Sequence, residues 1–483
     1  MMATEPRQSS GLSIERLRSL CRDGLVAVHG EAWAEVRGIS CDSRDVRRGD
    51  IFCCVTGSRH DGHTFAGDAI ASGAHALLVD RPLPAIDPSI PQIVVRDVRL
   101  AMGRLAAAIW GMPSTRLNLV GVTGTNGKTT TTALIASIMS AAGWKSEVMG
   151  TLTGTFTTPE APVLQETLAH YVDRGVKGVA MEVSSHALAL HRVAGTSFAA
   201  GVFTNLTRDH LDLHGTMDAY FEAKASLFVP EFTPIAVVNV DDPYGERLAA
   251  TRSIKVVPFS RHDATDVEVG PSSLSFAWRG LPIRVPLGGA FNLMNSLAAA
   301  TVAREIDIDA AAVVEGLASI PAVPGRFESI DAGQKFTVLV DYAHTPDGLA
   351  SVLRSVRESN ATGRLIVVFG CGGDRDKAKR PMMGEIAATL ADEVIVTSDN
   401  PRSEDPKAIL AAIVAGIPDH LRHRLVGVDV DRATSIQLAV GRANEGDVVV
   451  IAGKGHETTQ TIGTTVLSFD DRVVAREALR GRA

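Results

Sequence analysis

The sequence lacks the features that would place the chain in a membrane, in an oxidising compartment or on nucleic acid. It has no run of about 20 apolar residues, the length of a membrane-spanning helix. Its 5 cysteines show no C-x-x-C pair, so we expect reduced thiols and no zinc site. Residues 1–11 are polar and contain no apolar signal segment. A net charge of −7 is the wrong sign for binding nucleic acid. We therefore expect a cytoplasmic protein without a membrane or nucleic-acid partner.

The composition that remains is that of an ordinary globular protein. Of the 483 residues, 45% are apolar and 21% are charged, which supplies ample core material. A chain of this length holds roughly two to four domains. Two stretches rich in proline and glycine, at 111–114 and 321–325, predict linkers. We therefore predict three α/β domains at 1–112, 113–325 and 326–483.

The most informative segment is a glycine-bearing turn between a predicted strand and a predicted helix. The apolar run at 117–122 predicts the strand, and apolar spacing over 129–142 predicts the helix. Such a turn directs backbone N–H groups and a helix N-terminus at one point, which favours phosphate. Lys128 adds charge for the outer phosphates, and the Thr129 hydroxyl can bind Mg²⁺. Val122 stands where the strict G-x-x-x-x-G-K-[ST] pattern has glycine, so we interpret the segment as a variant ATP site.

Further polar groups follow the predicted strands of the central domain, where we expect a mostly parallel sheet covered on both faces. The strand predicted at 178–181 runs into Glu182, and another runs into a loop that contains His210. An acid at the carboxyl end of a strand beside a phosphate loop suits a Mg²⁺ site. Lys224 lies among apolar residues of a helix predicted over 217–228. Its ordinary interpretation is a lysine with a buried stem and a solvated ammonium.

The first domain concentrates hydroxyl groups and positive charge in two loops. Helices near 12–20, 64–72 and 98–110 alternate with strands near 75–79 and 92–96, which predicts a small α/β domain. The donors are Ser43, Arg44, Arg47, Arg48, Arg59 and His63. They are compatible with a pocket for a phosphorylated ligand and, equally, with a solvated basic surface.

The third domain has four predicted strands that each end in a polar loop. These strands are predicted at 338–340, 365–369, 393–396 and 448–451. Ligands of open α/β sheets bind outside the carboxyl ends of the strands, so we predict a second site at this edge. The Gly-Cys-Gly-Gly segment at 370–373 lacks a full G-x-G-x-x-G pattern, and dinucleotide binding is therefore not favoured.

In combination, these motifs resemble those of the Mur ligases, ATP-dependent amide-forming enzymes of peptidoglycan precursor synthesis. The resemblance covers nearly the whole chain and rests, in order, on 124–130, 182–186, 205–212, 292–295, 324–328 and 341–346. It implies a small α/β UDP-binding domain, a central phosphate-loop ATPase domain with a mostly parallel sheet, and a C-terminal Rossmann-like α/β domain.

The resemblance also implies where ATP and Mg²⁺ bind. The ATP-binding residues would be Gly124, Thr125, Asn126, Gly127, Lys128, Thr129, Thr130, Asn292, Asn295, Arg326 and Asp341. The catalytic residues would be Lys128, Glu182, His210 and Lys224, and the Mg²⁺ ligands Thr129, Glu182, His210 and Lys224. Lys224 would be carbamylated, which converts a cation into a carboxylate-like ligand. Because Arg326 and Asp341 come from the linker and the third domain, the site would be complete only after domain closure.

Within the family, the segments 42–44, 62–63 and 157–159 resemble members that add one diamino acid to UDP-N-acetylmuramoyl-L-alanyl-D-glutamate, and 399–402 resembles the form that selects meso-2,6-diaminopimelate. The nucleotide-sugar peptide would contact Ser43, His63, Thr157, Thr158, Ser184, Arg192 and carbamylated Lys224. The amino acid would contact Arg375, Asp399, Asn400, Pro401, Arg402, Gly453 and Glu457. Arg402 can bind the second carboxylate of diaminopimelate, which lysine lacks. Phe156 and Leu190 depart from the pattern of some relatives.

The implied reaction passes the γ-phosphoryl group of ATP to the D-Glu side-chain carboxylate and forms an acyl phosphate that the amine attacks. Two anions must approach each other, which requires positive charge and metal between them. We expect a monomer. The alternatives are a lysine-adding member, a folylpolyglutamate synthase, which would lack the first domain, a phosphate-loop ATPase that moves a partner, and an inactive scaffold.

Overall fold

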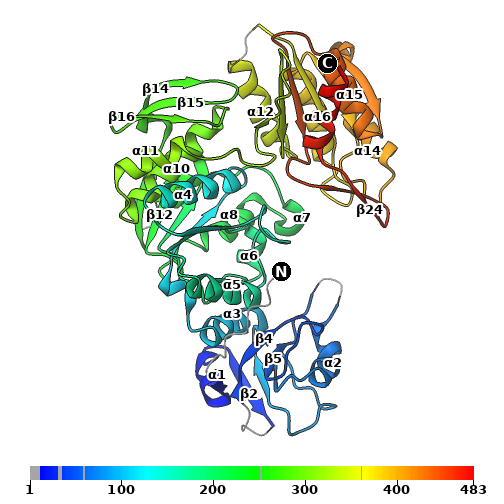
Figure 1. Cartoon of the computed structure of the whole chain (residues 1–483). Coiled ribbons are helices and arrows are strands. Elements are labelled where there is room, and N and C mark those ends of the chain that lie inside the picture. The colour runs from blue at the N-terminus through cyan, green and yellow to red at the C-terminus, as the bar shows by residue number, and fades with distance from the viewer. Residues whose placement is uncertain (1–10, 31–34, 58–59, 251–252, 360–361, 483) are drawn as a thin grey trace.

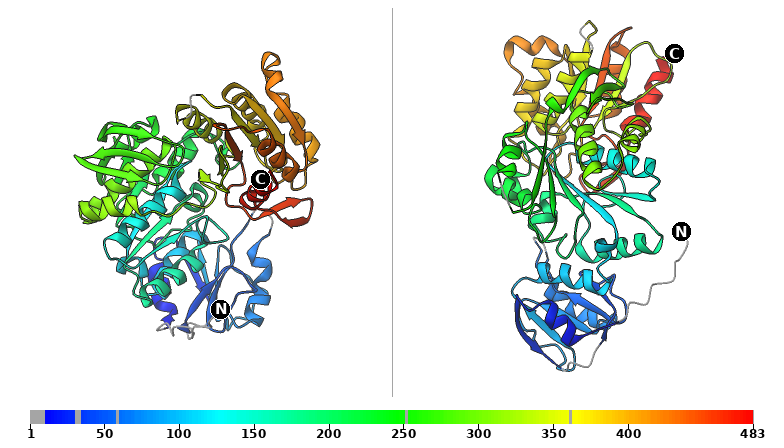
Figure 2. Two further views of the ribbon diagram at one scale, coloured as in Figure 1. Left: turned by 45° about the horizontal axis from the view of Figure 1, so that its top comes forward. Right: turned by 90° about the vertical axis from the view of Figure 1, so that its left-hand side faces the viewer.

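The computed structural model describes residues 11–30, 35–57, 60–250, 253–359 and 362–482. It arranges the chain as three α/β units that follow one another in sequence order (Figure 1). The first unit lies at the opposite end from the third, with the central unit between them (Figure 2, right). Residues 1–10 and Arg59, on which we made predictions, lie outside the described residues.

The first unit is built on a five-stranded sheet in the order β2-β7-β6-β5-β4, parallel except for β2 against β7. The helix predicted over 12–20 is shorter, because Leu12 and Ser13 form a strand with β3 and Ser13 caps the helix that follows. The elements are β1 (Leu12–Ser13), α1 (Ile14–Leu20), β2 (Leu25–His29), β3 (Glu35–Val36), β4 (Gly38–Ser40), β5 (Asp50–Cys53), η1 (Gly62–Phe65), α2 (Ala66–Ala71), β6 (Ala76–Val79), β7 (Gln92–Val95) and α3 (Val98–Ile109).

Helix α3 joins the first unit to the central unit. It packs against α5 (Ala161–Asp173), and it approaches the segment after α6 (Ser185–Ala189) so closely that a Cβ on Gly103 would lie 2.6 Å from the Cβ of Ala194. Arg47 also forms a 3.0 Å ion pair with Glu166 of α5. The first unit is therefore fixed to the helical face of the central unit.

The central unit contains a six-stranded, fully parallel sheet in the order β13-β12-β11-β8-β10-β9. Its elements are η2 (Pro113–Arg116), β8 (Asn118–Thr123), α4 (Lys128–Ala141), β9 (Ser146–Met149), α5, β10 (Gly178–Glu182), α6 (Ser185–Ala189), β11 (Ala200–Phe203), α7 (Leu211–His214), α8 (Met217–Ala225), β12 (Ile235–Asn239), α9 (Pro243–Ala249), β13 (Lys255–Phe259), η3 (Arg261–Asp263), α10 (Phe291–Glu305) and α11 (Ala310–Ala318).

Both faces of this sheet are covered, as predicted for the central domain, and the apolar run at 117–122 is a buried strand. Val120 and Val122 belong to a core shared with α4, α10 and α11. Leu119 points into a second core, shared with α5 and α8. Because successive side chains of a strand alternate between faces, one continuous apolar strand serves two layers of helices.

A three-stranded antiparallel sheet in the central unit was not predicted. It consists of β14 (Ala264–Val269), β15 (Leu274–Trp278) and β16 (Leu281–Val285). The signal was present, because Leu274, Phe276 and Trp278 alternate with smaller or polar residues and are buried. They extend the core that α10 and α11 share with the parallel sheet.

The third unit contains a six-stranded sheet in the order β17-β18-β22-β19-β20-β21, parallel except for β17. A small hairpin of β23 and β24 stands apart from it and was also not predicted. The elements are β17 (Glu328–Ser329), β18 (Thr337–Asp341), α12 (Pro346–Ser359), β19 (Leu365–Phe369), α13 (Lys379–Leu390), β20 (Glu393–Thr397), α14 (Pro406–Val414), η4 (Asp419–Arg424), β21 (Leu425–Asp429), α15 (Arg432–Arg442), β22 (Val448–Ala452), β23 (Thr459–Ile462), β24 (Thr465–Ser468) and α16 (Asp471–Arg482).

The three-unit, mixed α/β architecture predicted from the resemblance is confirmed. Across the described ranges, no helix combines the length and apolar character needed to cross a bilayer.

Candidate active site

A cavity of about 440 Å³ lies between the central and third units. One wall is the turn at 125–130, between β8 and α4, and the opposite wall is formed by 341–344 and the first turns of α12. The volume is in the range of small-molecule sites. The cavity therefore contains the predicted phosphate loop and is closed by a different unit.

The phosphate loop adopts the strand–turn–helix geometry that the sequence predicts. Helix α4 begins at Lys128, and its N-cap, Gly127, has φ of 88°, in the left-handed region. A Cβ on Gly127 would lie 2.4 Å from Oδ1 of Asn295, so a larger residue is excluded by sterics as well. The first N–H groups of α4 are consequently presented beside the cavity, where an anion would satisfy them.

Two lysines converge on one carbonyl oxygen of this loop. Nζ of Lys128 and Nζ of Lys224 donate to the Gly124 carbonyl at 2.9 and 2.8 Å. The side chain of Lys224 is only 1% exposed, and its Nζ lies 4.7 Å from the ring centre of Tyr220. Burial, reinforced by Lys128, lowers the pKa of Lys224 well below its usual value. The interpretation of Lys224 as a solvated lysine is therefore wrong, and the buried amine favours its neutral form.

Two of the predicted metal ligands line the cavity beyond the carboxyl ends of β10 and β11, the two strands on either side of β8. Glu182 ends β10, and its carboxylate accepts hydrogen bonds from the N–H and hydroxyl of Thr151 at 2.9 and 3.1 Å. His210 follows β11 and contacts Asp209 at 3.3 Å. Burial, together with nearby Lys128 and Lys224, lowers the pKa of His210 to about 4 despite Asp209. A neutral imidazole is the form that binds metal.

These donors fit a metal cation whose coordination shell is completed by oxygen atoms of a bound substrate. Within the described ranges, no three His, Cys, Asp or Glu side chains cluster as a metal site. Glu182, His210 and the Thr129 hydroxyl lie around one cavity, and a carbamate on Lys224 would add an anionic oxygen ligand. Mg²⁺ usually takes few protein ligands and completes its shell with phosphate oxygens and water. The donor set is therefore suited to Mg²⁺ bound together with a nucleotide.

Arg326 connects the third unit to the phosphate loop. Its Nη2 donates to the Thr129 hydroxyl at 3.0 Å, and its Cζ lies 4.4 Å from the ring centre of Tyr342. Nε of Arg326 is buried and has no hydrogen-bond partner among the described residues. An anion in the cavity would satisfy this donor, so the arginine is placed to bind phosphate.

The remaining predicted ATP residues divide into lining and supporting groups. Asn295 lines the cavity, whereas Asn292 lies behind it, accepting from Nδ2 of Asn295 at 2.8 Å and donating to Gly288 O at 2.7 Å. Asp341 also lines the cavity and accepts the backbone N–H groups of Phe327 and Ala343, each at 2.7 Å. Burial raises the pKa of Asp341 despite the nearby Arg326.

The residues predicted for the nucleotide-sugar peptide fall in two places. Thr157 and Ser184 line the cavity close to Glu182, and the Thr158 hydroxyl donates to the Glu182 carbonyl at 2.9 Å. Arg192 donates to the Thr158 carbonyl at 3.0 Å. The half-exposed ring of Phe156 lies 5.1 Å from Cζ of Arg192, so it covers that guanidinium.

Ser43, in a turn of the first unit, and His63, in η1, do not line this cavity. His63 is buried between Asp61 at 2.6 Å and Asp80 at 3.2 Å. Arg44 is exposed and paired with Asp42. The loop that carries Ser43 also carries Arg47, whose ion pair with Glu166 brings this part of the first unit against the central unit.

The predicted amino-acid residues gather at one edge of the third sheet. The loop at 399–402 follows β20 and packs on the glycine segment at 370–373, where a Cβ on Gly373 would lie 1.8 Å from the Pro401 carbonyl. Nη1 of Arg402 donates to the Gly373 carbonyl at 2.7 Å. The glycines therefore allow two loops to pack closely, and this packing explains the Gly-rich segment without dinucleotide binding. Arg375 lies nearby on the exposed continuation of this segment, beside Asp374.

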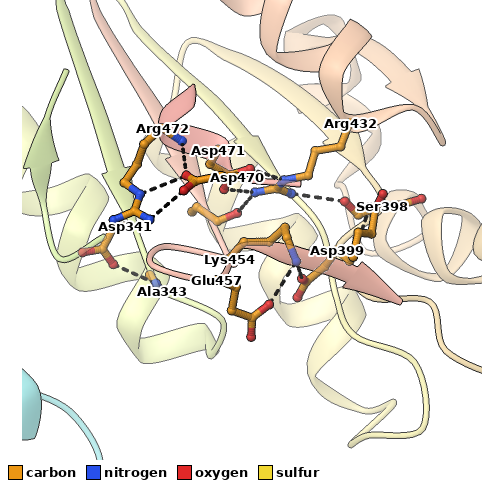
Figure 3. A network of polar contacts seen from close by, with 12 residues as sticks. Asp341, Ala343, Ser398, Asp399, Arg432, Lys454, Glu457, Asp470, Asp471 and Arg472 are labelled. Carbon is orange, nitrogen blue, oxygen red and sulfur yellow. Dashed lines mark hydrogen bonds and ion pairs between the residues drawn. The ribbon is translucent and has the colours of Figure 1, made fainter. Parts of the chain in front are cut away.

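A buried cation in this region was missed by the sequence analysis. Lys454 is fully buried, and its Nζ donates to Glu457 at 3.0 Å and Asn400 Oδ1 at 3.3 Å, and lies 3.9 Å from Asp399 (Figure 3). Burial alone would raise the pKa of Glu457, but Lys454 and Asn400 outweigh it and lower that pKa. The carboxylates predicted to accept a substrate ammonium are thus already paired.

A buried ion pair joins the strands that carry these loops. Arg432 of α15 forms two 2.7 Å hydrogen bonds with Asp471 of α16, and both side chains are 0% exposed (Figure 3). The same guanidinium donates to the carbonyls of Ser398 and Ala452, at the ends of β20 and β22. The pair therefore fixes the carboxyl ends of both strands. An arginine in an amphipathic helix gives no sequence signal for this role.

The geometry fits an enzyme that binds a nucleoside triphosphate between two units, with an acid and a neutral histidine beside a phosphate loop. Three family profiles match the chain: Mur ligase family, catalytic domain, over 35–110; Mur ligase middle domain, over 122–303; and Mur ligase, glutamate ligase domain, over 325–455. The chain belongs to the Mur ligase family.

Individual relatives are similar over nearly the full length. A UDP-N-acetylmuramoyl-L-alanyl-D-glutamate--2,6-diaminopimelate ligase from Syntrophomonas wolfei is 46% identical over 469 residues, which cover 93% of this chain and 95% of the relative. One of that name from Geobacillus kaustophilus is 44% identical over 484 residues, covering 94% and 97%. A solved structure of that name is 34% identical, covers 98% of this chain and 99% of its own, and has a TM-score of 0.67. The match over 35–110 disfavours a folylpolyglutamate synthase, which would lack this unit.

Proposed function

We propose that the chain is the ATP-dependent ligase that adds meso-2,6-diaminopimelate to the D-Glu side-chain carboxylate of UDP-N-acetylmuramoyl-L-alanyl-D-glutamate. The observation that carries the proposal is the cavity in which Lys128, Glu182 and His210 of the central unit face Arg326 from the third. Family membership and the names of the similar relatives support the same reaction.

The proposed first step transfers the γ-phosphoryl group of ATP to the D-Glu carboxylate, which gives an acyl phosphate and ADP. Lys128, the N-terminus of α4 and Arg326 bind the phosphates and offset the charge that accumulates between the two anions. Mg²⁺, when bound at Thr129, Glu182, His210 and carbamylated Lys224, supplies further positive charge. The amine of the amino acid then attacks the acyl carbon, phosphate leaves and the amine loses a proton.

The residues proposed for the amino acid are those at the edge of the third sheet. The Arg402 guanidinium donates through Nη1 to the Gly373 carbonyl, which leaves other donors of its five-donor fork for a substrate carboxylate. Asp399, Asn400 and Glu457 already contact Lys454, and they would accept the substrate ammonium with their remaining oxygen lone pairs. Arg375 would bind the other carboxylate, and Pro401 and Gly453 would shape the pocket. A lysine substrate would leave the guanidinium unpaired, which disfavours it.

The decisive assay measures phosphate release with ATP, Mg²⁺ and UDP-N-acetylmuramoyl-L-alanyl-D-glutamate, with either meso-diaminopimelate or L-lysine. We expect release with meso-diaminopimelate and a product heavier by that residue. Phosphate release with lysine would support the proposed reaction but would contradict the role of Arg402 in selecting diaminopimelate. ATP turnover that depends on neither amino acid would indicate a phosphate-loop ATPase instead.

Replacing Arg326 with alanine is expected to raise the KM for ATP by about tenfold to a hundredfold, because a charge-assisted contact to phosphate is lost. The KM for the nucleotide-sugar peptide should change little. Arg326→Lys keeps the charge but loses the fork that reaches Thr129, so it should fall between wild type and alanine. An unchanged KM for ATP in Arg326→Ala would contradict the proposed role.

We also propose domain boundaries at 112/113 and 325/326. All strands of each of the three large sheets come from one of these ranges, which supports the division. The substrates, ATP and a nucleotide-linked sugar peptide, are cytoplasmic metabolites, and we propose that the enzyme acts there as a monomer.

A further inference from the structure

The loop at 399–402 is held from two sides, and one side is the glycine segment of the same unit. The Gly373 N–H donates to the Asn400 carbonyl at 2.8 Å, and Nη1 of Arg402 donates back to the Gly373 carbonyl at 2.7 Å. This side fixes the end of the Arg402 side chain. It also holds the backbone on either side of Arg402, since Asp374 accepts the Ser403 N–H at 3.2 Å, but among the described residues it makes no hydrogen bond to the backbone of Arg402 itself.

The other side of the loop is held by the hairpin of β23 and β24. Nε2 of Gln460 donates to the Asp399 carbonyl at 2.7 Å, and the Thr461 N–H donates to Oδ1 of Asn400 at 3.0 Å. Asn400 therefore receives Lys454 and Thr461 on the same oxygen. These contacts orient its amide, whose Nδ2 donates to Glu457 at 2.8 Å.

The hairpin also holds both backbone polar groups of Arg402. The Arg402 N–H donates to the Thr461 carbonyl at 3.0 Å, and the Gly463 N–H donates to the Arg402 carbonyl at 2.6 Å. Arg402 pairs with Ile462 as an isolated parallel bridge. Its φ of 51° lies in the left-handed region, which non-glycine residues adopt only when their surroundings hold them there.

The buried part of the hairpin is the part that contacts this loop. Gln460 on β23 is 6% exposed, whereas β24 is exposed along its whole length. The hairpin residues are not among those that line the nucleotide cavity. A change in the hairpin should consequently reach the amino-acid loop without reaching ATP.

We propose that the β23–β24 hairpin is the positioning element for Arg402, and that Gln460 is its key positioning residue. The hairpin holds the Arg402 backbone in the one conformation from which the guanidinium reaches the second carboxylate of a dicarboxylic diamino acid. This inference rests on the proposed function and extends it from the selecting residue to the structure that makes selection possible.

The first test is Gln460→Met, which keeps the length of the side chain and removes the donor to the Asp399 carbonyl. The KM for meso-diaminopimelate should rise by about tenfold, the effect of one lost hydrogen bond to a buried carbonyl. The KM values for ATP and for the nucleotide-sugar peptide should stay within about twofold of wild type. Thr465→Ala, on the exposed strand β24, is the matched control and should leave all three KM values unchanged.

A second pair of variants acts on the hairpin turn. Gly463 has φ of 60°, and a Cβ built there would meet no atom within 4 Å, so only backbone conformation opposes a side chain. Asparagine tolerates this region and valine does not. Gly463→Val should therefore raise the KM for meso-diaminopimelate and lower the preference for it over lysine, while Gly463→Asn should retain wild-type values.

The outcomes separate this inference from the proposed function. If the wild-type enzyme fails to use meso-diaminopimelate, the proposed function fails and the inference falls with it. If wild type uses it and both Gln460→Met and Gly463→Val retain its KM and selectivity, the inference alone is overturned. A merely structural role would lower the active fraction and kcat without changing KM for one substrate, and that result would also overturn it.

Discussion

Lys224→Ala is expected to lower kcat by about 10³-fold or more. The variant loses the carbamate proposed to bind Mg²⁺, and the metal offsets the negative charge that develops during phosphoryl transfer. Its thermal stability should change little. The Lys224 amine is buried, so removing it relieves desolvation, while the lost side chain leaves a cavity that acts in the opposite direction. Activity at fixed substrate concentrations and the unfolding temperature, measured on the same sample, check both statements.

Chemical rescue distinguishes a carbamate from an ordinary lysine. Short carboxylic acids such as acetate should partly restore the activity of Lys224→Ala, because they supply the missing carboxylate-like oxygens. Lys224→Arg keeps a positive charge and should be neither active nor rescued. Lys255→Ala, at an exposed lysine of the same unit, is the matched control and should keep wild-type activity. Wild-type activity in Lys224→Ala would refute the carbamate role.

Arg402→Ala should lower kcat/KM for meso-diaminopimelate by about 10²- to 10³-fold, the cost of removing one partner of a charge-assisted pair. The KM for ATP should change little, because Arg402 does not line the nucleotide cavity. Initial rates at varied amino acid and saturating ATP measure the effect. The ratio of meso-diaminopimelate to lysine turnover should fall at the same time.

A surface arginine of the same unit serves as the control for this substitution. Arg422 lies on η4, is more than half exposed and pairs with Asp419. Arg422→Ala should leave unchanged both kcat/KM for meso-diaminopimelate and the ratio of meso-diaminopimelate to lysine turnover, since exposed ion pairs contribute little. If Arg402→Ala retains the amino-acid preference of the wild type, Arg402 is not the selector.

The parts of the site that could be predicted from sequence lie in local motifs at strand ends. The phosphate loop follows β8 and Glu182 ends β10, and in parallel sheets such positions meet at one edge. Strand and helix periodicity placed both elements to within a few residues. At these positions the local sequence and the tertiary structure favour the same elements, and the resemblance to the family could therefore be recognised from the sequence.

Other features depend on contacts between distant residues, which periodicity does not encode. The pattern around Lys224 is equally that of a lysine with a solvated end, and only the fold places its amine on the loop at Gly124. Lys454 is a lysine between two glycines in the sequence, and only the fold buries it against Glu457. Likewise, Asn292 and Asn295 look alike in sequence, but one lines the cavity and the other supports it.

The hydrogen bond from Arg326 to Thr129 joins residues 197 positions apart, and the cavity has one wall on each side of that contact. Nucleotide affinity is therefore partly a measure of how far the two units have closed. Thermodynamic reciprocity then links the substrates: an amino acid that favours the closed arrangement must tighten ATP binding by the same factor by which ATP tightens the binding of the amino acid. The loop at 399–402 and the phosphate loop are separate segments, but an equilibrium titration of either ligand would thus show the effect of the other.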